Sequence, residues 1–294
     1  MIKSFINFIF YEKRYSPTTI AAYKNDLIQF QAFLSATYEL AHPEQANFNM
    51  LRSWIVHLRE ENYSARSINR KIATLKSFYK FLSRKGIIQK NPSQRIRSLK
   101  LDRRTPVFLE EHKIIALLDG FEFSEDFPGL RSKLILEMLY ATGIRLSELI
   151  QLSWADIDFS KKLIRVVGKG SKERWIPITD QLLQLIKRYE LHKRQFFEGS
   201  PISSKLILTD AGAPAYPMLV YKTVKQYLSQ ITTQDQKSPH VLRHSFATHL
   251  LNKGADLNAI KELLGHSSLN ATQVYTHNSL SKLKEVFDQA HPKA

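Results

Sequence analysis

Residues 238–277 of the 294-residue chain read SPHVLRHSFATHLLNKGADLNAIKELLGHSSLNATQVYTH, and they contain five of its ten histidines. Gly254 and Gly265 each follow an apolar run with helical spacing. Glycine commonly ends a helix because it adopts the left-handed backbone conformation without steric cost. The spacing therefore predicts three short helices with tight breaks between them, over residues 239–253, 256–264 and 268–276.

Several polar residues of this stretch are spaced so that their side chains could lie close together. His240, Arg243 and His244 are spaced i, i+3 and i+4, so they share one face of the first predicted helix. His266 falls in the second break, and Tyr275 ends the third predicted helix. The pattern allows a base, an arginine, a second histidine and a phenol to converge on one point.

Other interpretations of these residues are weaker. A metal site is disfavoured because HVLRH lacks the carboxylate of the HExxH pattern and the chain has no cysteine. The segment IKELLGHSSLNATQV has the layout of a helix-turn-helix, but Lys261 occupies the position four before the turn glycine, where a small residue is usual. An isolated helical histidine or a lone tyrosine also commonly serves packing alone.

Three motifs of this stretch carry a resemblance to a known family: HVLRH at 240–244, LLGHSS around His266 and TQVYTH around Tyr275. They resemble the C-terminal signature of tyrosine recombinases, most closely the Xer type, which acts on chromosome dimers. ATGIRLSEL and INRKIATLKSFYKFL extend the resemblance over nearly the whole chain. The fold this implies is mainly α with two domains: a SAM-like helical core-binding domain, then a mixed α/β catalytic domain with a small β-hairpin or sheet.

The distribution of charge fits a division into two domains. The formal net charge is +16, and residues 1–106 contribute +12 of it through 19 Lys and Arg against 7 Asp and Glu. Positive charge spread over several predicted helices favours nucleic acid over a membrane surface. The absence of cysteine excludes disulfides and thiol chemistry, and no stretch has the length of a membrane span or the pattern of a signal peptide. We therefore expect a soluble, cytoplasmic protein without membrane contact.

The N-terminal part predicts a helical bundle with one basic side. A first helix begins at Ser16, which is followed by proline at the first helical position, a second carries Trp54, and a third begins at Ser64 and ends before Gly86. We expect a core-binding domain over 1–90, a basic linker over 91–106 and a catalytic domain over 107–294. The expected DNA contacts are Arg66, Arg70, Lys71, Lys76, Arg103 and Arg104.

Two further features belong to the expected catalytic domain. Arg145 lies among apolar residues at a helix start, where its burial requires a partner, so it forms either a structural ion pair with Glu148 or an anion receptor that Glu148 positions. Residues 163–167 and 174–176 predict a β-hairpin joined by GKGSK, with Lys169 at its tip. A lysine in such a turn is ordinarily solvated, whereas the resemblance implies a general acid.

The resemblance implies a complete set of reactive groups and no metal, cofactor or ATP. Cleavage of a phosphodiester without water needs a nucleophile, cations on the nonbridging oxygens and a proton for the leaving oxygen. The implied roles are nucleophile for Tyr275, phosphate binding for Arg145 and Arg243, proton transfer from the tyrosine for His240, donation to the phosphate for His266, protonation of the 5′ oxygen for Lys169, and orientation of Arg145 for Glu148.

The resemblance also implies partners. These are a double-stranded recombination site, a tetramer formed with itself or with a second related recombinase on two duplexes, and a DNA translocase as activator. The apolar edge of residues 279–294 is expected to dock on a neighbouring protomer, with docking on its own domain as the alternative. Chromosome-dimer resolution is the expected role. An integrase of a phage, conjugative transposon or integron, a type IB topoisomerase-like enzyme and an inactive DNA-binding protein remain the alternatives.

Overall fold

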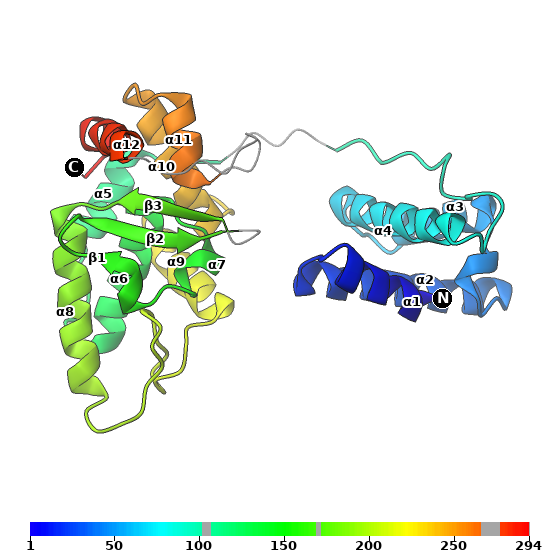
Figure 1. Ribbon diagram of the computed structural model, residues 1–294, viewed down its shortest axis with the longest axis horizontal. Coiled ribbons are helices and arrows are strands. Elements are labelled where there is room, and N and C mark those ends of the chain that lie inside the picture. The colour runs from blue at the N-terminus through cyan, green and yellow to red at the C-terminus, as the bar shows by residue number, and fades with distance from the viewer. Residues whose placement is uncertain (102–106, 169–171, 266–276, 294) are drawn as a thin grey trace. The chain divides into compact units, whose positions relative to one another are not determined.

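The protein is described by a computed structural model of residues 1–294 that leaves out residues 102–106, 169–171, 266–276 and 294 (Figure 1). It divides into two compact units, Met1–Arg104 and Thr105–Ala294. Within the described residues, none of the helices combines the length and the apolar character needed to cross a bilayer.

The N-terminal unit is entirely helical in its described part. Its elements are α1 (Ile2–Asn7), a π-helical turn η1 (Phe8–Glu12), α2 (Pro17–Tyr38), a 3₁₀ turn η2 (Pro43–Gln45), α3 (Phe48–Glu60) and α4 (Ala65–Arg84). The serine caps expected from the sequence are present, since the hydroxyls of Ser16 and Ser64 accept from the third backbone N–H that follows each. Helix α1 was not expected; it joins the core through Phe5, which is fully buried.

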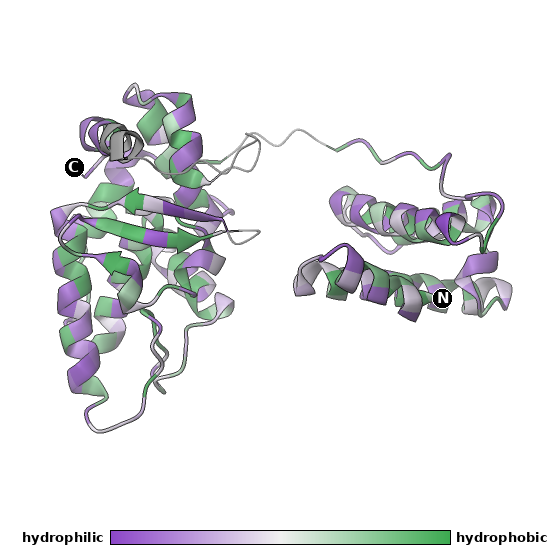
Figure 2. Cartoon of the chain, in the orientation of Figure 1, coloured by the Kyte–Doolittle hydropathy of each residue, from purple (hydrophilic) through white to green (hydrophobic). Residues whose placement is uncertain are grey.

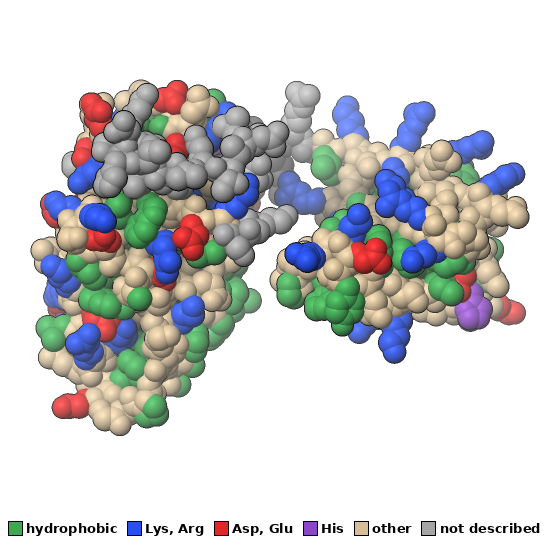
Figure 3. All heavy atoms as spheres, in the orientation of Figure 1, with side chains coloured by type: hydrophobic (Ala, Val, Ile, Leu, Met, Phe, Trp, Pro, Cys, Tyr) green, Lys and Arg blue, Asp and Glu red, His purple; other side chains and the backbone are tan. Residues whose placement is uncertain are grey.

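The basic side of this unit is real, but one lysine assigned to it faces inward. Arg66, Arg70 and Lys76 are exposed on α4, and Figure 3 shows Lys and Arg side chains spread over the visible face of the unit with few Asp and Glu side chains between them. The side chain of Lys71 is only 3% exposed, and its Nζ lies 2.9 Å from Asp26 Oδ1. The expectation that Lys71 contacts DNA is therefore wrong, because its charge is committed to a buried ion pair. Arg103 and Arg104 lie outside the described residues.

The C-terminal unit packs helices around a small sheet. Its helices are α5 (Glu111–Gly120), α6 (Phe127–Thr142), α7 (Leu146–Leu149), α8 (Asp180–Phe196), α9 (Pro217–Ile231), α10 (Pro239–Asn252), α11 (Leu257–Leu264) and α12 (His277–Ala290), with a 3₁₀ turn η3 (Trp154–Asp156). The strands β1 (Ile157–Asp158), β2 (Leu163–Val167) and β3 (Glu173–Pro177) form an antiparallel sheet in the order β1-β2-β3. The structure therefore confirms the mainly helical, two-unit fold with a small sheet and adds a third strand.

Helix α6 is the centre of this unit. It is buried along nearly its whole length and contacts α8, α9 and α10. Figure 2 shows β2 as mostly hydrophobic with one hydrophilic position, and β3 as hydrophilic in its N-terminal part. A helix that is buried on nearly all sides, as α6 is, must be surrounded by other elements. Burial of α6 therefore fixes its C-terminal end, at Thr142 and Gly143, deep in the unit.

Helix α12 ends against its own unit in this single chain. Phe287 is 1% exposed and its ring stacks on that of His291, with 4.3 Å between centroids. Lys293 Nζ lies 2.6 Å from Glu137 Oε1, and both side chains are 4% exposed. The described part of the apolar edge, at Phe287, is thus covered within the same unit, which is the alternative placement considered above. The side chains of residues 277–283 are outside the described part, and docking on a neighbouring protomer stays a prediction.

Candidate active site

The C-terminal end of α11 gathers three arginines from three different segments. Its last carbonyls have no partner within the helix, as at every helix C-terminus. The carbonyl of Leu263 accepts from Arg174 Nε at 2.8 Å, and the carbonyl of Leu264 accepts from Arg243 Nη2 at 2.6 Å. The carbonyl of Gly265 accepts from Arg145 Nη2 at 2.8 Å. Cations also suit the negative end of the helix dipole. Helix α11 therefore brings together side chains that are up to 98 positions apart in the chain.

Glu148 is the anion at the centre of this cluster. Its Oε1 accepts from Arg145 Nη1 at 2.8 Å and its Oε2 accepts from the Arg145 backbone N–H at 2.8 Å, so it caps α7 and holds the arginine at once. Both oxygens also accept from Arg174, at 2.9 and 2.8 Å. Burial alone would raise the pKa of Glu148, but the hydrogen bonds and charge of Arg174, and the two bonds from Arg145, outweigh burial and lower it. Glu148 is therefore a carboxylate.

Positive charge is in excess at this point. Three arginines surround one glutamate, which leaves a net charge of +2 among these four side chains. Burial, followed by repulsion from Arg145 and Arg174, lowers the pKa of Arg243 to about 10. An anion placed beside Arg243 would relieve both the repulsion and the loss of water. The cluster is thus electrostatically prepared for a phosphate.

Two glycines with left-handed backbone form the floor of the cluster. Gly143 has φ +58° and its carbonyl accepts from Arg243 Nη1, while Gly265 has φ +65°. A Cβ on Gly143 would lie 2.5 Å from a ring atom of Phe246 and 2.8 Å from Leu264, which no side chain tolerates without movement. Glycine is therefore required at position 143 both by the conformation and by the close approach of α10 and α11.

The expected site residues are partly assembled by the described structure. Arg145, Glu148 and Arg243 meet at the end of α11, and the side chain of Arg145 keeps 33% of its surface exposed. His240 is exposed one turn before Arg243 on α10, so the two share a face as the spacing predicted. Lys169, His266 and Tyr275 lie outside the described residues. Two of these three directly follow glycines that border the cluster: Gly168 precedes Lys169, and Gly265 precedes His266.

Arg174 was not among the residues expected at this site. It lies on β3 opposite Val166 of β2, so it belongs to the inward face of the hairpin, and it is only 5% exposed. The hairpin pairing could have indicated this position, because pairing the two strands from the GKGSK turn places Arg174 opposite an apolar residue that faces the core. An arginine at an inward position needs a buried partner, and that partner is Glu148.

One histidine of the long C-terminal stretch is structural. The Nε2–H of His249 donates to the carbonyl of Leu109 at 2.9 Å, and its Nδ1 accepts from the Tyr140 hydroxyl at 2.9 Å. Burial lowers the pKa of His249, which keeps the ring neutral near pH 7. Among the described residues, no three His, Asp or Glu side chains lie together as metal ligands would.

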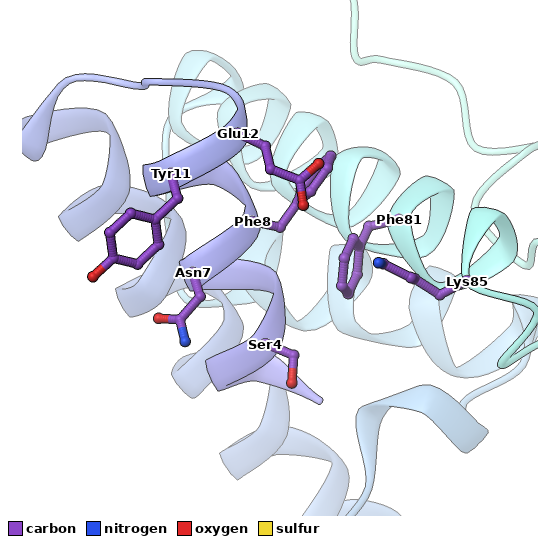
Figure 4. A pocket seen from close by; sticks show the side chains of 7 residues that line it. All are labelled: Ser4, Asn7, Phe8, Tyr11, Glu12, Phe81 and Lys85. Atoms are coloured by element: carbon purple, nitrogen blue, oxygen red, sulfur yellow. The ribbon is translucent and has the colours of Figure 1, made fainter.

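The N-terminal unit has a pocket whose lining residues lie between positions 4 and 85 of the chain. It lies between the first helical turns and α4 (Figure 4), and none of the residues expected at the active site lines it. Its lining consists of Ser4, Asn7, Phe8, Tyr11, Glu12, Phe81 and Lys85.

The chain matches known proteins over its whole length. Residues 108–282 match the Phage integrase family, and residues 2–86 match the Phage integrase N-terminal SAM-like domain. The chain is 38% identical to the tyrosine recombinase XerC of Chlorobaculum parvum, over 100% of this chain and 94% of that protein. It is 35% identical to the tyrosine recombinase XerD of Staphylococcus aureus, over 100% of this chain and 99% of that protein.

Two solved structures share the fold. The XerH site-specific recombinase bound to its palindromic difH substrate, in a post-cleavage complex, has a TM-score of 0.71 at 23% identity and covers 90% of this chain and 78% of its own. The Tn1549 transposon integrase in complex with circular intermediate DNA has a TM-score of 0.70 at 21% identity and covers 96% and 97%. Together with the family match and the curated relatives, these likenesses lead to one conclusion: the chain belongs to the phage integrase family and is a DNA recombinase, a tyrosine recombinase of the Xer type.

Proposed function

We propose that the protein is a site-specific recombinase that cuts and rejoins DNA through a 3′-phosphotyrosine intermediate on Tyr275. The observation that supports this most directly is the cluster at the end of α11. There Arg145 and Arg243 are each tied to a backbone carbonyl, so their remaining N–H groups and the excess positive charge are fixed in place before a substrate arrives. Preorganised donors stabilise a phosphoryl-transfer transition state more than donors that must first be ordered.

The proposed reaction proceeds in two steps, cleavage and rejoining. The Tyr275 oxygen attacks phosphorus while His240 takes the phenolic proton, and the bond from phosphorus to the 5′ oxygen breaks as Lys169 protonates that oxygen. Arg145, Arg243 and His266 hold the nonbridging oxygens, and Glu148 orients Arg145. The free 5′ hydroxyl of a partner strand then attacks the phosphotyrosine, which restores both the phosphodiester and the tyrosine. Because the covalent intermediate keeps the bond energy, ligation needs no ATP.

We further propose that the biological role is resolution of chromosome dimers at cell division, in the cytoplasm. The support is the 35–38% identity to proteins named XerC and XerD over 90% or more of both chains. A mobile-element integrase is the alternative, and the Tn1549 integrase shares the fold at 21% identity. The proposed partners are a double-stranded recombination site, a tetramer with itself or a related recombinase, and a DNA translocase that activates it.

In the proposed tetramer, α12 leaves its own unit and docks on the neighbouring protomer. A head-to-tail contact of this kind closes a ring when the rotation between protomers allows it. The helix is suited to such an exchange because it presents Phe287 and Val286 on one side, and it is too short to be stable without a docking surface.

The proposed chemistry is tested by trapping the covalent complex. A nicked suicide substrate that carries the host's dimer-resolution site loses its short 5′ fragment after cleavage, so the adduct accumulates. We expect a protein–DNA adduct that resists denaturation and forms equally fast in excess EDTA, since the arginines carry the phosphate charge. A reaction that stops with EDTA and resumes with Mg²⁺ or Zn²⁺ would instead assign the site to metal-assisted cleavage.

The basic face of α4 provides a second prediction. Replacing exposed Lys76 by alanine is expected to weaken binding to specific and scrambled duplexes alike, and to reduce the slope of log K against log salt by about one. The reason is that one phosphate contact is lost. Fluorescence anisotropy between roughly 50 and 200 mM salt measures the slope.

The matched control for Lys76 is Lys71→Met, on the same helix. It also removes a positive charge, but from the buried pair with Asp26. It should lower the free energy of unfolding and leave the salt slope of the folded fraction unchanged. Equal slopes for Lys76→Ala and the wild type would remove Lys76 from the DNA-contacting surface.

A further inference from the structure

Arg174 links three segments of the catalytic unit through one buried guanidinium. It is 5% exposed on β3. Two of its nitrogens bind both oxygens of Glu148, at 2.9 and 2.8 Å, and its Nε donates to the carbonyl of Leu263 at 2.8 Å. A planar guanidinium that binds a carboxylate in this forked manner has little freedom to rotate. The hairpin, α7 and the end of α11 are therefore held in a fixed relation by one side chain.

The backbone on either side of this ion pair leads directly to two of the proposed reactive residues. A Cβ placed on Gly265 would lie 3.1 Å from Arg174 Nη1, and one placed on Gly168 would lie 3.4 Å from Glu148 Oε1 and 3.8 Å from Arg174 Nη1. Both glycines thus lie against the pair. In the chain, Gly168 is followed by Lys169 and Gly265 by His266.

The third residue that this pair controls is Arg145. Glu148 accepts from its backbone and its side chain, and the Gly265 carbonyl accepts from its Nη2. Without Arg174, Glu148 would keep only the bonds from Arg145 and would lose its second, buried positive partner. Arg145, the backbone before Lys169 and the backbone before His266 therefore share one support.

Arg174 itself is not placed to touch the DNA. Burial alone does not distinguish it from Arg243, because the two residues are 5% and 8% exposed, but both terminal nitrogens of Arg174 are bound to the carboxylate of Glu148. Three of its N–H groups are bound to protein acceptors, and the flanking glycines pack against its Nη1, Cδ and Cζ atoms. Its influence on the reaction must therefore act through the residues around it.

We propose that Arg174 is a positioning residue for DNA cleavage, which holds the chain preceding Lys169 and His266 in fixed relation to Arg145. The inference rests on the proposed function, because Lys169 and His266 are reactive groups only in that mechanism. A purely structural role is the competing explanation, since a buried ion pair that loses one partner also destabilises the fold.

The test compares Arg174→Lys with the wild type in single-turnover cleavage of the suicide substrate, with protein in excess. Lysine keeps the charge but cannot bind both oxygens of Glu148 and the Leu263 carbonyl together. We expect specific DNA binding to stay close to that of the wild type, and the cleavage rate constant to fall roughly 100-fold, as for a misplacement of about 1 Å in a catalytic group. As long as the folded protein still saturates the substrate, an unfolded fraction leaves this rate constant unchanged.

A second substrate separates positioning from stability. When sulfur replaces the bridging 5′ oxygen, the leaving group needs little protonation, so a displaced Lys169 matters less. Arg174→Lys should then be slowed by roughly 10-fold or less, with the remaining loss arising through His266 and Arg145. The control is Arg131→Lys, which alters another buried arginine of this unit, one bound to Asp210 and a backbone carbonyl, and it should cleave both substrates at wild-type rates.

Each outcome of these experiments supports or contradicts the positioning role of Arg174. A wild-type rate constant for Arg174→Lys, or an equal loss on the oxygen and sulfur substrates, overturns the positioning role. If Arg174→Lys yields no folded protein, Arg174→Gln replaces it, because its amide still donates hydrogen bonds but cannot form the forked pair with Glu148; the same preference for the sulfur substrate is expected and its absence overturns the proposal. Failure of the wild type to form any adduct instead rejects the proposed function.

Discussion

Replacing Tyr275 by phenylalanine is expected to abolish the covalent adduct while specific DNA binding changes by no more than about twofold, since a single hydroxyl contributes at most a modest hydrogen bond to affinity. The substitution removes only the phenolic oxygen, and the aromatic ring keeps its volume. Without that oxygen no other group of the proposed mechanism can attack phosphorus. The measurement is denaturing electrophoresis of the suicide-substrate reaction, with binding followed in parallel by anisotropy.

The matched control for Tyr275 is Tyr11→Phe. Tyr11 is 71% exposed on the N-terminal unit and has no place in the proposed chemistry, so the adduct should form at the wild-type rate. A denaturation-resistant adduct with Tyr275→Phe would show that another residue is the nucleophile. Loss of DNA binding in that variant would show that Tyr275 contributes to the DNA-binding surface. The missing adduct would then be explained by lost binding, and the assignment of Tyr275 as nucleophile would lose its support.

The parts of the fold that the sequence predicts well are those with strong local signals. Gly143 and Gly265 follow clear apolar periodicity, and both adopt the left-handed conformation that ends α6 and α11. Ser16 and Ser64 mark helix starts for an equally local reason, because their hydroxyls satisfy backbone N–H groups that the first turn leaves free.

What the sequence alone did not reveal depends on the register of one strand against another or on the packing of helices. Strand β1 has two residues, too few to show alternation. Lys71 lies three residues after Ile68 and four before Leu75, on the apolar stripe of α4, but its charge is typical of a surface position. The buried partner that allows this placement, Asp26, comes from α2. Arg174 looks like part of a basic hairpin until the pairing with Val166 turns it inward. In each case a tertiary contact decided what local propensity left open.

The same limit applies to the active site. The spacing on α10 places His240 and Arg243 on one face, but nothing local indicates that the carbonyl ends of α11 hold three arginines. Glu148 could be read as a partner of Arg145 because the two lie one turn apart. That it also binds Arg174, and thereby couples the hairpin to the arginines proposed to bind the phosphate, follows only from the three-dimensional arrangement.

The substitution Arg243→Lys is expected to slow cleavage by roughly 10³- to 10⁵-fold, the range found when an arginine that stabilises phosphoryl transfer is lost. Arg243 donates from one terminal nitrogen to the Gly143 carbonyl and from the other to that of Leu264, and both nitrogens keep a second N–H for the phosphate. A single ammonium group cannot bind two carbonyls on different segments and a phosphate with the same geometry.

The loss should also depend on pH in a defined direction. Burial and the charges of Arg145 and Arg174 lower the pKa of Arg243 to about 10, and the arginine stays charged well below that value. The ordinary pKa of lysine is already about two units lower than that of arginine. The same burial and the same neighbours would lower the pKa of an ammonium group at this position as well, since both disfavour the charged form of any base. A base is charged only below its pKa, so the Arg243→Lys variant should lose positive charge as the pH rises toward 9 while the wild type does not.

The measurement that isolates this effect is the ratio of wild-type to Arg243→Lys single-turnover rate constants at pH 7, 8 and 9. Titration of any other group affects both proteins and largely cancels in the ratio, whereas titration at position 243 does not. We expect the ratio to widen as the pH rises. Arg131→Lys, tested in parallel, should give a ratio near one at every pH. A small ratio for Arg243→Lys, or one that is constant with pH, would mean that Arg243 contributes packing at the end of α11 and no charge to the transition state, because a packing defect does not titrate in this range.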